Sequence, residues 1–334
     1  MQDQLTIPQL KKLLATPKTC SIVIHRNPDG DALGSALSLA YYLRRSNHQV
    51  SVISPSDYPE YLSWMPDIDK VIIADNELKD SKFKLFQSEL IFCLDFNNLD
   101  RVDVVALQIA EAKCPVILLD HHEDPVFFAD LMYTDIKVSS TSELLFKFFR
   151  ELDPHFKPDV QLASHMLTGI ITDTGSFRYN INAGLFPIVG ELVSTGVDYP
   201  ALQQLINNNF STKQIQLLGY CLDKRMEIIP EFQTAIIYLD KQDFKDFRIA
   251  RGDTEGIVNY PLMIKNIAVS IFITEQLNQI KFSFRSKGDI AVNKFATLHF
   301  QGGGHKNAAG GQLTIPLPEA VDRVKTLLPN LLNL

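Results

Sequence analysis

Residues 21–45 read SIVIHRNPDGDALGSALSLAYYLRR and contain a strand signal, a turn signal and a helix signal in succession. The first seven residues, SIVIHRN, are a short apolar run rich in β-branched side chains, which predicts a strand. The sequence Asn27-Pro28-Asp29-Gly30 follows and predicts a turn. After the turn, apolar residues recur at positions 33, 36, 37, 40 and 43, the spacing of a helix with one buried face. The stretch therefore predicts a strand followed by a crossover helix.

The same alternation continues through the first half of the chain. Further strands are predicted at HQVSVISP (48–55), ELIFCLDF (89–96) and PVILLDHH (115–122). Helices are predicted at RVDVVALQIAEA (101–112), SSTSELLFKFFREL (139–152) and VQLASHMLTGII (160–171). Near-continuous apolar strands that alternate with helices are typical of an α/β domain with a doubly wound, mainly parallel sheet. A ligand site is expected outside the carboxyl ends of its strands.

The character of the chain changes after residue 190. Residues 191–225 predict helices around Gly196 and Pro200, which we interpret as a helical linker. Residues 226–334 contain the strand-like segments EFQTAIIYLD, NIAVSIFITEQ and QIKFSFRS and a helical segment, DIAVNKFATLHF. We therefore expect a first domain over 1–190, a smaller α+β domain over 226–334, and an active-site cleft between them.

Composition excludes several classes of protein. The 334 residues include 32 Lys+Arg and 39 Asp+Glu, a net charge of −7, and 46% are hydrophobic, which argues against disorder. The acidic balance also argues against long nucleic acid held on a basic surface, although short anionic ligands can bind a local positive pocket. The sequence has neither a signal-peptide pattern nor an apolar run of about 18 residues, so we expect a cytoplasmic protein with no membrane partner. Its four cysteines, at 20, 93, 114 and 221, have no metal-site spacing and are expected to be reduced, buried thiols.

Acidic and imidazole side chains follow the apolar runs. They are His25, Asp29, Asp31, Asp95, Asp120, His121, His122 and Asp173. Taken singly, Asp31 suits an N-cap for a helix beginning at Ala32, and Asp173 suits a turn with Thr174 and Gly175. Together at the carboxyl ends of one sheet, these anions would repel one another unless a cation lay among them.

The types of ligand indicate which cation. Carboxylates and imidazoles without thiolates suit Mn²⁺ or Mg²⁺, with Zn²⁺ or Co²⁺ as substitutes. His25 and Asp29 are spaced to reach one ion, and Asp31 can point to a second. A shared carboxylate can bridge two ions roughly 3.5–4 Å apart, which activates a water and holds a phosphoryl oxygen. No GxGxxG or GxxxxGK[ST] motif follows the first strand, which argues against a dinucleotide enzyme or a P-loop kinase.

A second cluster lies near the C-terminus, in FSFRSKGD (282–289) and GGGHKNAAGG (302–311). Successive glycines can form a nest of backbone amides that binds an anion. Arg285 and His305 can add charged donors, and an arginine can bind a phosphate through two hydrogen bonds. Three glycines alone would favour a flexible surface loop, so the prediction of ligand binding depends on these two neighbours.

Five motifs in order resemble the DHH phosphoesterase superfamily and its associated C-terminal domain. They are HRNPDGDALGSA, CLDF, LDHH, ITDTGSF and GGGHKNAAGG, which span residues 25–311. The resemblance implies that His25, Asp29 and Asp95 hold one metal. It implies that Asp31, Asp95, His121 and Asp173 hold a second, with Asp95 bridging the two. His122 would contact the scissile phosphate, with Asp120 orienting the imidazoles. Arg285, Ser286, Gly303, Gly304 and His305 would hold the other end of the substrate, and Phe177 suits either base stacking or core packing.

The resemblance also implies an activity. Chain length and the second domain favour the stand-alone members that hydrolyse RNAs of two to about five nucleotides to mononucleotides, and pAp to AMP. Two divalent ions would be the cofactors, Mn²⁺ first and Mg²⁺ or Co²⁺ as alternatives. The expected partners are short RNA, pAp or pApA and no long duplex nucleic acid, while a homodimer stays open. Alternative functions are a cyclic di-AMP or pApA phosphodiesterase, a pyrophosphatase, a non-catalytic nucleotide sensor and a purely structural α/β protein.

Overall fold

The computed structural model describes residues 6–208, 210–250 and 252–331. The chain divides into two compact units, residues 1–209 and 210–334. The division falls within residues 191–225, the range expected to be a linker. Helices α7 (Leu185–Ser194) and α8 (Tyr199–Asn207) belong to the first unit, and α9 (Thr212–Lys224) belongs to the second.

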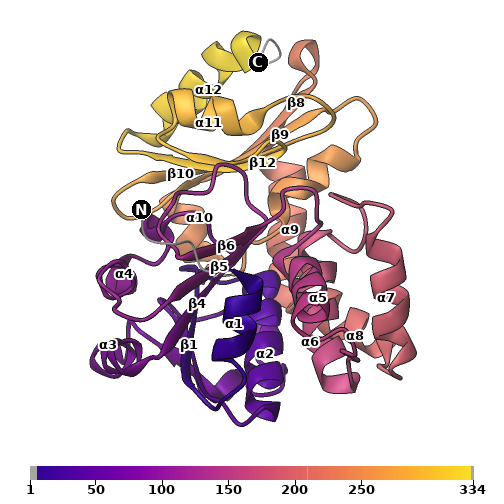
Figure 1. Cartoon of the computed structure of the whole chain (residues 1–334). Coiled ribbons are helices and arrows are strands. Elements are labelled where there is room, and N and C mark those ends of the chain that lie inside the picture. The colour runs from indigo at the N-terminus through magenta and orange to yellow at the C-terminus, as the bar shows by residue number, and fades with distance from the viewer. Residues whose placement is uncertain (1–5, 209, 251, 332–334) are drawn as a thin grey trace. The chain divides into compact units, whose positions relative to one another are not determined.

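The first unit contains the predicted parallel sheet (Figure 1). Its strands are β1 (Thr19–Ile24), β2 (Gln49–Ser54), β3 (Val71–Ile73), β4 (Leu90–Leu94), β5 (Val116–Asp120) and β6 (Leu131–Thr134). All five neighbouring pairs are parallel, in the order β3-β2-β1-β4-β5-β6. The chain therefore winds in opposite directions from β1 and β4, and the carboxyl ends of these two strands mark the switch point where such sheets bind ligands.

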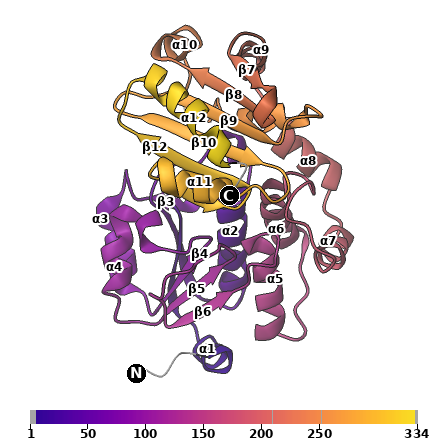
Figure 2. The same cartoon turned by 90° about the horizontal axis from the view of Figure 1, so that it is seen from above.

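Helices cover both faces of this sheet, as Figures 1 and 2 show. On one face lie α1 (Ile7–Leu13), α2 (Gly30–Arg45), α5 (Thr141–Leu152), α6 (Val160–Asp173), α7 and α8; on the other lie α3 (Leu78–Gln87) and α4 (Ala106–Ala110). Side chains alternate between the two cores along each strand. In β1, Ile22 and Ile24 pack beneath α2, whereas Val23 packs on the side of α3 and α4. This explains why the central strands are apolar throughout.

One predicted helix is largely wrong. Residues 101–112 were expected to form a single crossover helix, but the segment contains two 3-10 turns, Leu99–Arg101 and Asp103–Val105, followed by the five-residue α4. Val102, Val104 and Val105 are β-branched and disfavour a continuous helix. Val102 and Val105 are fully buried, so three-residue turns place both valines in the core.

The second unit is a mixed sheet with helices on both faces (Figure 2). Its elements are α9, β7 (Met226–Ile229), β8 (Thr234–Leu239), α10 (Lys241–Asp246), β9 (Val269–Glu275), β10 (Ile280–Ser286), α11 (Val292–His299), β11 (Gly303–His305), β12 (Ala308–Leu313) and α12 (Leu317–Leu331). The strand order is β11-β12-β10-β9-β8-β7, and β8 and β9 form its parallel pair. Phe282 and Phe284 of β10 pack with Phe295 and Phe300 beneath α11. The predicted α+β architecture is confirmed.

Two smaller expectations concern thiols and membranes. Cys20, Cys93 and Cys221 are buried and unpaired as expected, while Cys114 is half-buried. Within the described ranges, no helix combines the length and the apolar character needed to cross a membrane.

Candidate metal centre

The turn after β1 places the first three predicted ligands. Asp29 is the N-cap of α2, and its Oδ1 accepts hydrogen bonds from the backbone amides of Asp31 (2.9 Å) and Ala32 (3.1 Å). The alternative in which Asp31 caps this helix is therefore wrong, because α2 begins at Gly30 and Asp31 lies in its first turn. A Cβ atom at Gly30 would lie 2.5 Å from the Thr172 hydroxyl, so only glycine allows α6 to pack this close.

His25 leaves β1 with one ring nitrogen already engaged. Its Nδ1 lies 2.9 Å from the carbonyl oxygen of Arg26, which can only accept, so Nδ1 carries the proton of the neutral ring. Nε2 then faces two carboxylates, at 4.0 Å from Asp29 Oδ1 and 3.5 Å from Asp95 Oδ2. His25, Asp29 and Asp95 form one group of atoms close enough together to hold a metal ion.

Asp31 is buried against the start of α5. Its Oδ2 accepts a hydrogen bond from the amide of Thr141 (2.6 Å), and its Oδ1 accepts one from the amide of Ser142 (2.9 Å). These are orphan donors of a helix N-terminus, where the helix dipole also favours a negative charge. Gly169 of α6 adjoins the same carboxylate, because a Cβ atom there would lie 2.5 Å from Asp31 Oδ1.

A second group joins Asp31 to His121 and Asp173. His121 Nε2 lies 4.0 Å from Asp31 Oδ2 and 3.6 Å from Asp173 Oδ2. Asp173 follows the helix predicted over 160–171 and is the last residue of helix α6. The helix ends there because Gly175, Ser176 and Phe177 take left-handed backbone conformations, with φ between 54° and 64°.

Asp95 lies between the two groups. It follows β4 with a φ of 65°, a left-handed conformation that Asp tolerates better than most residues. Its Oδ2 faces His25, while its Oδ1 lies 3.7 Å from His121 Nε2 and accepts a hydrogen bond from the Thr141 hydroxyl at 2.9 Å. One carboxylate therefore presents an oxygen to each group.

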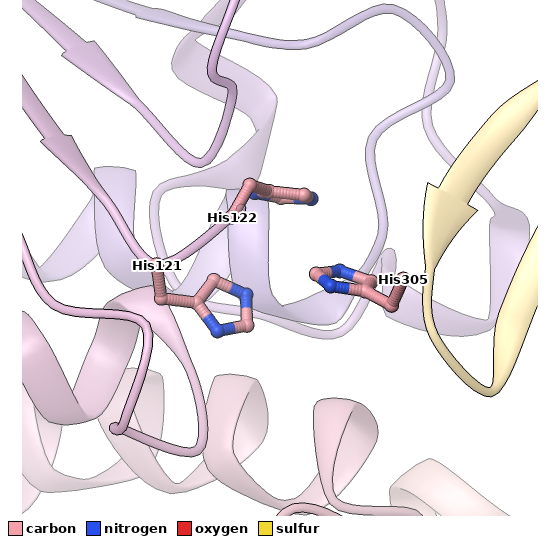
Figure 3. Close-up of side chains that lie close together, drawn as sticks. All are labelled: His121, His122 and His305. Carbon is pink, nitrogen blue, oxygen red and sulfur yellow. The ribbon is translucent and has the colours of Figure 1, made fainter. Parts of the chain in front are cut away.

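Asp120, His121 and His122, at the end of β5, make different contacts. His121 belongs to the second group, whereas His122 Nδ1 is hydrogen-bonded to Asp120 Oδ1 at 2.7 Å. Figure 3 shows both rings extending from the segment that follows this strand. Burial alone would lower the pKa of His122, but the Asp120 hydrogen bond and the charge of Asp95 raise it to about 9. Burial lowers the pKa of His121, which keeps that ring neutral.

The carboxylates of the site are poorly neutralised by the chain itself. Burial, together with the charge of Asp95, raises the pKa of Asp31 well above its usual range, and burial with the charge of Asp31 does the same for Asp173. Among the described residues, Asp120 Oδ2 and Asp173 Oδ2 are buried and accept no hydrogen bond. Buried carboxylate oxygens without donors, beside the neutral imidazole of His121, fit a divalent cation.

Sequence reasoning missed two contributors to this site. Thr141 donates to both Asp31 and Asp95, although its segment, SSTSE, was interpreted only as a helix start. Arg101 was assigned to a helix, but its charge acts on both His25 and His122. Neither role has a signal in one sequence, since capping and packing explain the same residue types.

The predicted substrate residues lie in the second unit. Arg285 and Ser286 end β10, and Gly303, Gly304 and His305 make up β11. The glycine-rich stretch is a hairpin of β11 and β12 rather than a loop. Gly304 has a φ of 137°, and a Cβ there would lie 2.5 Å from the Ala308 carbonyl oxygen.

Two of the predicted substrate contacts have structural partners. The Ser286 hydroxyl donates to the Ile290 carbonyl (2.7 Å) and accepts from the Asn307 amide (2.8 Å). The Phe177 ring lies 6.2 Å from the Phe186 ring and packs against the first unit's core. These contacts favour the core-packing interpretation of Phe177.

Comparisons with known proteins find two matching domain families and several relatives. The DHH family N-terminal domain matches residues 19–170, and the DHHA1 domain matches residues 233–332. A probable bifunctional oligoribonuclease and PAP phosphatase NrnA of Streptococcus mutans is 31% identical over 90% of this chain and 92% of its own length. The bifunctional oligoribonuclease and PAP phosphatase NrnA of Bacillus subtilis is 28% identical over 88% of this chain and 89% of its own.

Solved structures show the same similarity. An exopolyphosphatase-related protein from Bacteroides fragilis is 34% identical and has a TM-score of 0.93 over 97% of this chain and 95% of that one. The exonuclease RecJ bound to manganese is 17% identical with a TM-score of 0.55, over 98% of this chain and 95% of that one, and shares the fold.

Proposed function

We propose, from the premise that this chain belongs to the DHH family, that it is a metal-dependent phosphoesterase that cleaves short oligoribonucleotides to mononucleotides and pAp to AMP. The observation that carries the proposal is Asp95, whose two oxygens face two separate groups of ligand atoms. The activity itself is taken from the names of the two bacterial relatives, which align over most of their length.

Each ligand has an assigned role. His25, Asp29 and Asp95 would hold one divalent ion, most readily Mn²⁺. Asp31, Asp95, His121 and Asp173 would hold a second. When bound, such a pair supplies a water of lowered pKa and neutralises charge on a phosphoryl oxygen.

The remaining residues act on the substrate. The Asp120 hydrogen bond keeps Nδ1 of His122 engaged and favours the cationic ring, so Nε2–H can donate to an oxygen of the scissile phosphate. In the second unit, Arg285 would pair with a phosphate of the substrate, and His305 would add a donor beside Gly303 and Gly304. Ser286 would contribute through its remaining acceptor position, since its proton is already donated to Ile290.

The first test is Asp95→Asn. Asparagine tolerates the left-handed backbone at this position better than alanine, so the variant changes the ligand without adding strain. Loss of a shared ligand should remove several kcal/mol of transition-state stabilisation, which is at least about a hundred-fold in kcat. The matched control is Asp223→Asn, because Asp223 is exposed and forms its ion pair with the neighbouring, exposed Lys224. An Asp95→Asn variant with near wild-type turnover would contradict the shared-ligand assignment.

One assay shows which of the candidate substrates the protein cleaves. Mn²⁺-loaded protein is incubated with pApA, a five-nucleotide RNA, a 24-nucleotide RNA, pAp, cyclic di-AMP and pyrophosphate, and the products are resolved by chromatography. Mononucleotides from the short RNAs and AMP from pAp, with the long RNA spared, are expected. Turnover of cyclic di-AMP or pyrophosphate alone would overturn the substrate class, and binding without turnover would favour a nucleotide sensor.

A further inference from the structure

Thr141 contacts both of the carboxylates that organise the site. It is fully buried at the first position of α5. Its backbone amide donates to Asp31 Oδ2 at 2.6 Å, and its hydroxyl donates to Asp95 Oδ1 at 2.9 Å. The two acids come from different elements, the first turn of α2 and the segment after β4, so one residue ties both to α5.

The two contacts differ in kind. Asp31 is held by backbone amides, those of Thr141 and Ser142, and substitution of Thr141 by valine, serine or alanine keeps both donors. Asp95 is held by the side chain of Thr141. The hydroxyl is also not needed for the helix itself, because Ser140 is the N-cap and accepts the hydrogen bond from the Glu143 amide at 3.0 Å.

This hydroxyl is placed to set the rotation of the Asp95 carboxylate. The terminal torsion of an aspartate is broad, so the carboxylate turns easily unless a hydrogen bond fixes it. The nearest histidine nitrogens lie farther away than the hydroxyl, with His25 Nε2 3.5 Å from Oδ2 and His121 Nε2 3.7 Å from Oδ1. The Thr141 hydroxyl is therefore closer to the Asp95 carboxylate than either of these histidine nitrogens is.

We propose that Thr141 is a positioning residue whose hydroxyl fixes Asp95 with one oxygen toward each ligand group before any metal binds. The inference rests on the proposed function only in taking the two groups as metal sites. Partners that orient metal ligands typically change metal affinity by about 10- to 100-fold when they are removed. Without the hydroxyl, Asp95 must be ordered at the moment of binding, and the ions bind more weakly.

The test compares three variants. Thr141→Val replaces the hydroxyl with a methyl group at nearly constant shape, and Thr141→Ser restores it. Ser140→Ala is the matched control, because it removes a hydroxyl from the same helix end that touches neither carboxylate. Free Mn²⁺ is followed by electron paramagnetic resonance during titration of the full chain, and melting temperature is recorded in EDTA and at saturating Mn²⁺. Thr141→Ala is measured alongside, in case valine prevents folding.

The expected results separate positioning from simple stability. Thr141→Val should weaken Mn²⁺ binding about 10- to 100-fold and shrink the Mn²⁺-induced rise in melting temperature. Thr141→Ser should stay within a few-fold of wild type. Ser140→Ala should lower the melting temperature in EDTA and leave Mn²⁺ affinity unchanged.

Three outcomes would overturn the inference. They are unchanged Mn²⁺ affinity in both Thr141→Val and Thr141→Ala, an equal loss of affinity in Ser140→Ala, and no Mn²⁺ binding by wild type. The readout is binding, so it is independent of the activity proposed above. If wild-type protein binds Mn²⁺ but cleaves neither short RNA nor pAp, the proposed function is wrong. The Mn²⁺-binding comparison still tests the role of Thr141 in that case.

Discussion

Gly169 shows, at the scale of single residues, how little room separates the acidic site from the helix behind it. A Cβ atom there would lie 2.5 Å from Asp31 Oδ1 and 2.9 Å from the Ser142 Cβ atom. Either Asp31 or the start of α5 would have to move. Asp31 and the start of α5 are joined by the hydrogen bonds that position this ligand. A side chain at position 169 should therefore lower metal affinity as well as stability.

We therefore predict that Gly169→Ala lowers both stability and Mn²⁺ affinity. Overpacking of this kind costs about 1–3 kcal/mol, which exceeds the gain of about 1 kcal/mol from alanine in a helix. Gly190→Ala is the control, since Gly190 lies in α7 with nothing within 4 Å of an added Cβ, and it should stabilise the protein slightly. Thermal unfolding and Mn²⁺ titration check both. A Gly169→Ala variant with wild-type stability and Mn²⁺ affinity would contradict the prediction, because the site would then accommodate the added methyl group.

At the scale of elements, strong apolar patterns predicted well and weak ones did not. β1, β4 and β5 were predictable because both faces of these strands are buried. β3 and β6, at the sheet's edges, have three and four residues, too few for a pattern to develop. α6 was predicted as a helix over 160–171, and Asp173, which follows that range, is its last residue.

Helix α6 also carries a histidine with an unusual environment. His165 is 1% exposed, and among the described residues neither of its ring nitrogens has a hydrogen-bond partner. Burial lowers its pKa to about 4, below the value of about 6.5 expected in the unfolded chain. Between these values the unfolded state binds more protons, so stability falls as the pH drops through this window and is constant above it.

We predict that His165→Leu removes this part of the pH dependence. The contribution of His165 across the window is roughly 3 kcal/mol at most. Melting temperatures in EDTA, from pH 7 to pH 4, should fall less steeply for the variant than for wild type. The metal ligands titrate in both proteins, so the difference between the two curves isolates His165. Parallel curves would mean that the folded protein already accommodates a protonated ring.

At the scale of the whole molecule, the two-domain organisation was visible in the sequence but the identity of the substrate-binding atoms was not. The change from alternating strands and helices to short strands marked the second unit, and motif order identified the family. Ser286 and the glycines of β11 were chosen from a motif, and their contacts are those of a well-packed hairpin. A motif names these residues, but only the structure shows that Ser286 is hydrogen-bonded within the unit itself.

Arg285 tests whether the second unit takes part in substrate binding. It lies on β10, whereas the ligand groups lie in the first unit, so its loss should leave Mn²⁺ affinity unchanged. A hydrogen bond to a charged group contributes about 1.5–3 kcal/mol, so Arg285→Ala should raise KM for pApA by roughly 10- to 100-fold with a smaller effect on kcat.

The matched control for this test is Lys281→Ala. Lys281 lies four residues from Arg285 on the same face of β10, because side chains alternate along a strand. Its replacement by alanine removes the same positive charge as Arg285→Ala. If both variants raise KM equally, the effect is one of overall charge and the assignment of Arg285 fails. If neither does, substrate binding depends on the first unit alone. A rise in KM confined to Arg285→Ala, with Mn²⁺ binding intact, would make the second unit a recognition domain for substrates that the first unit hydrolyses.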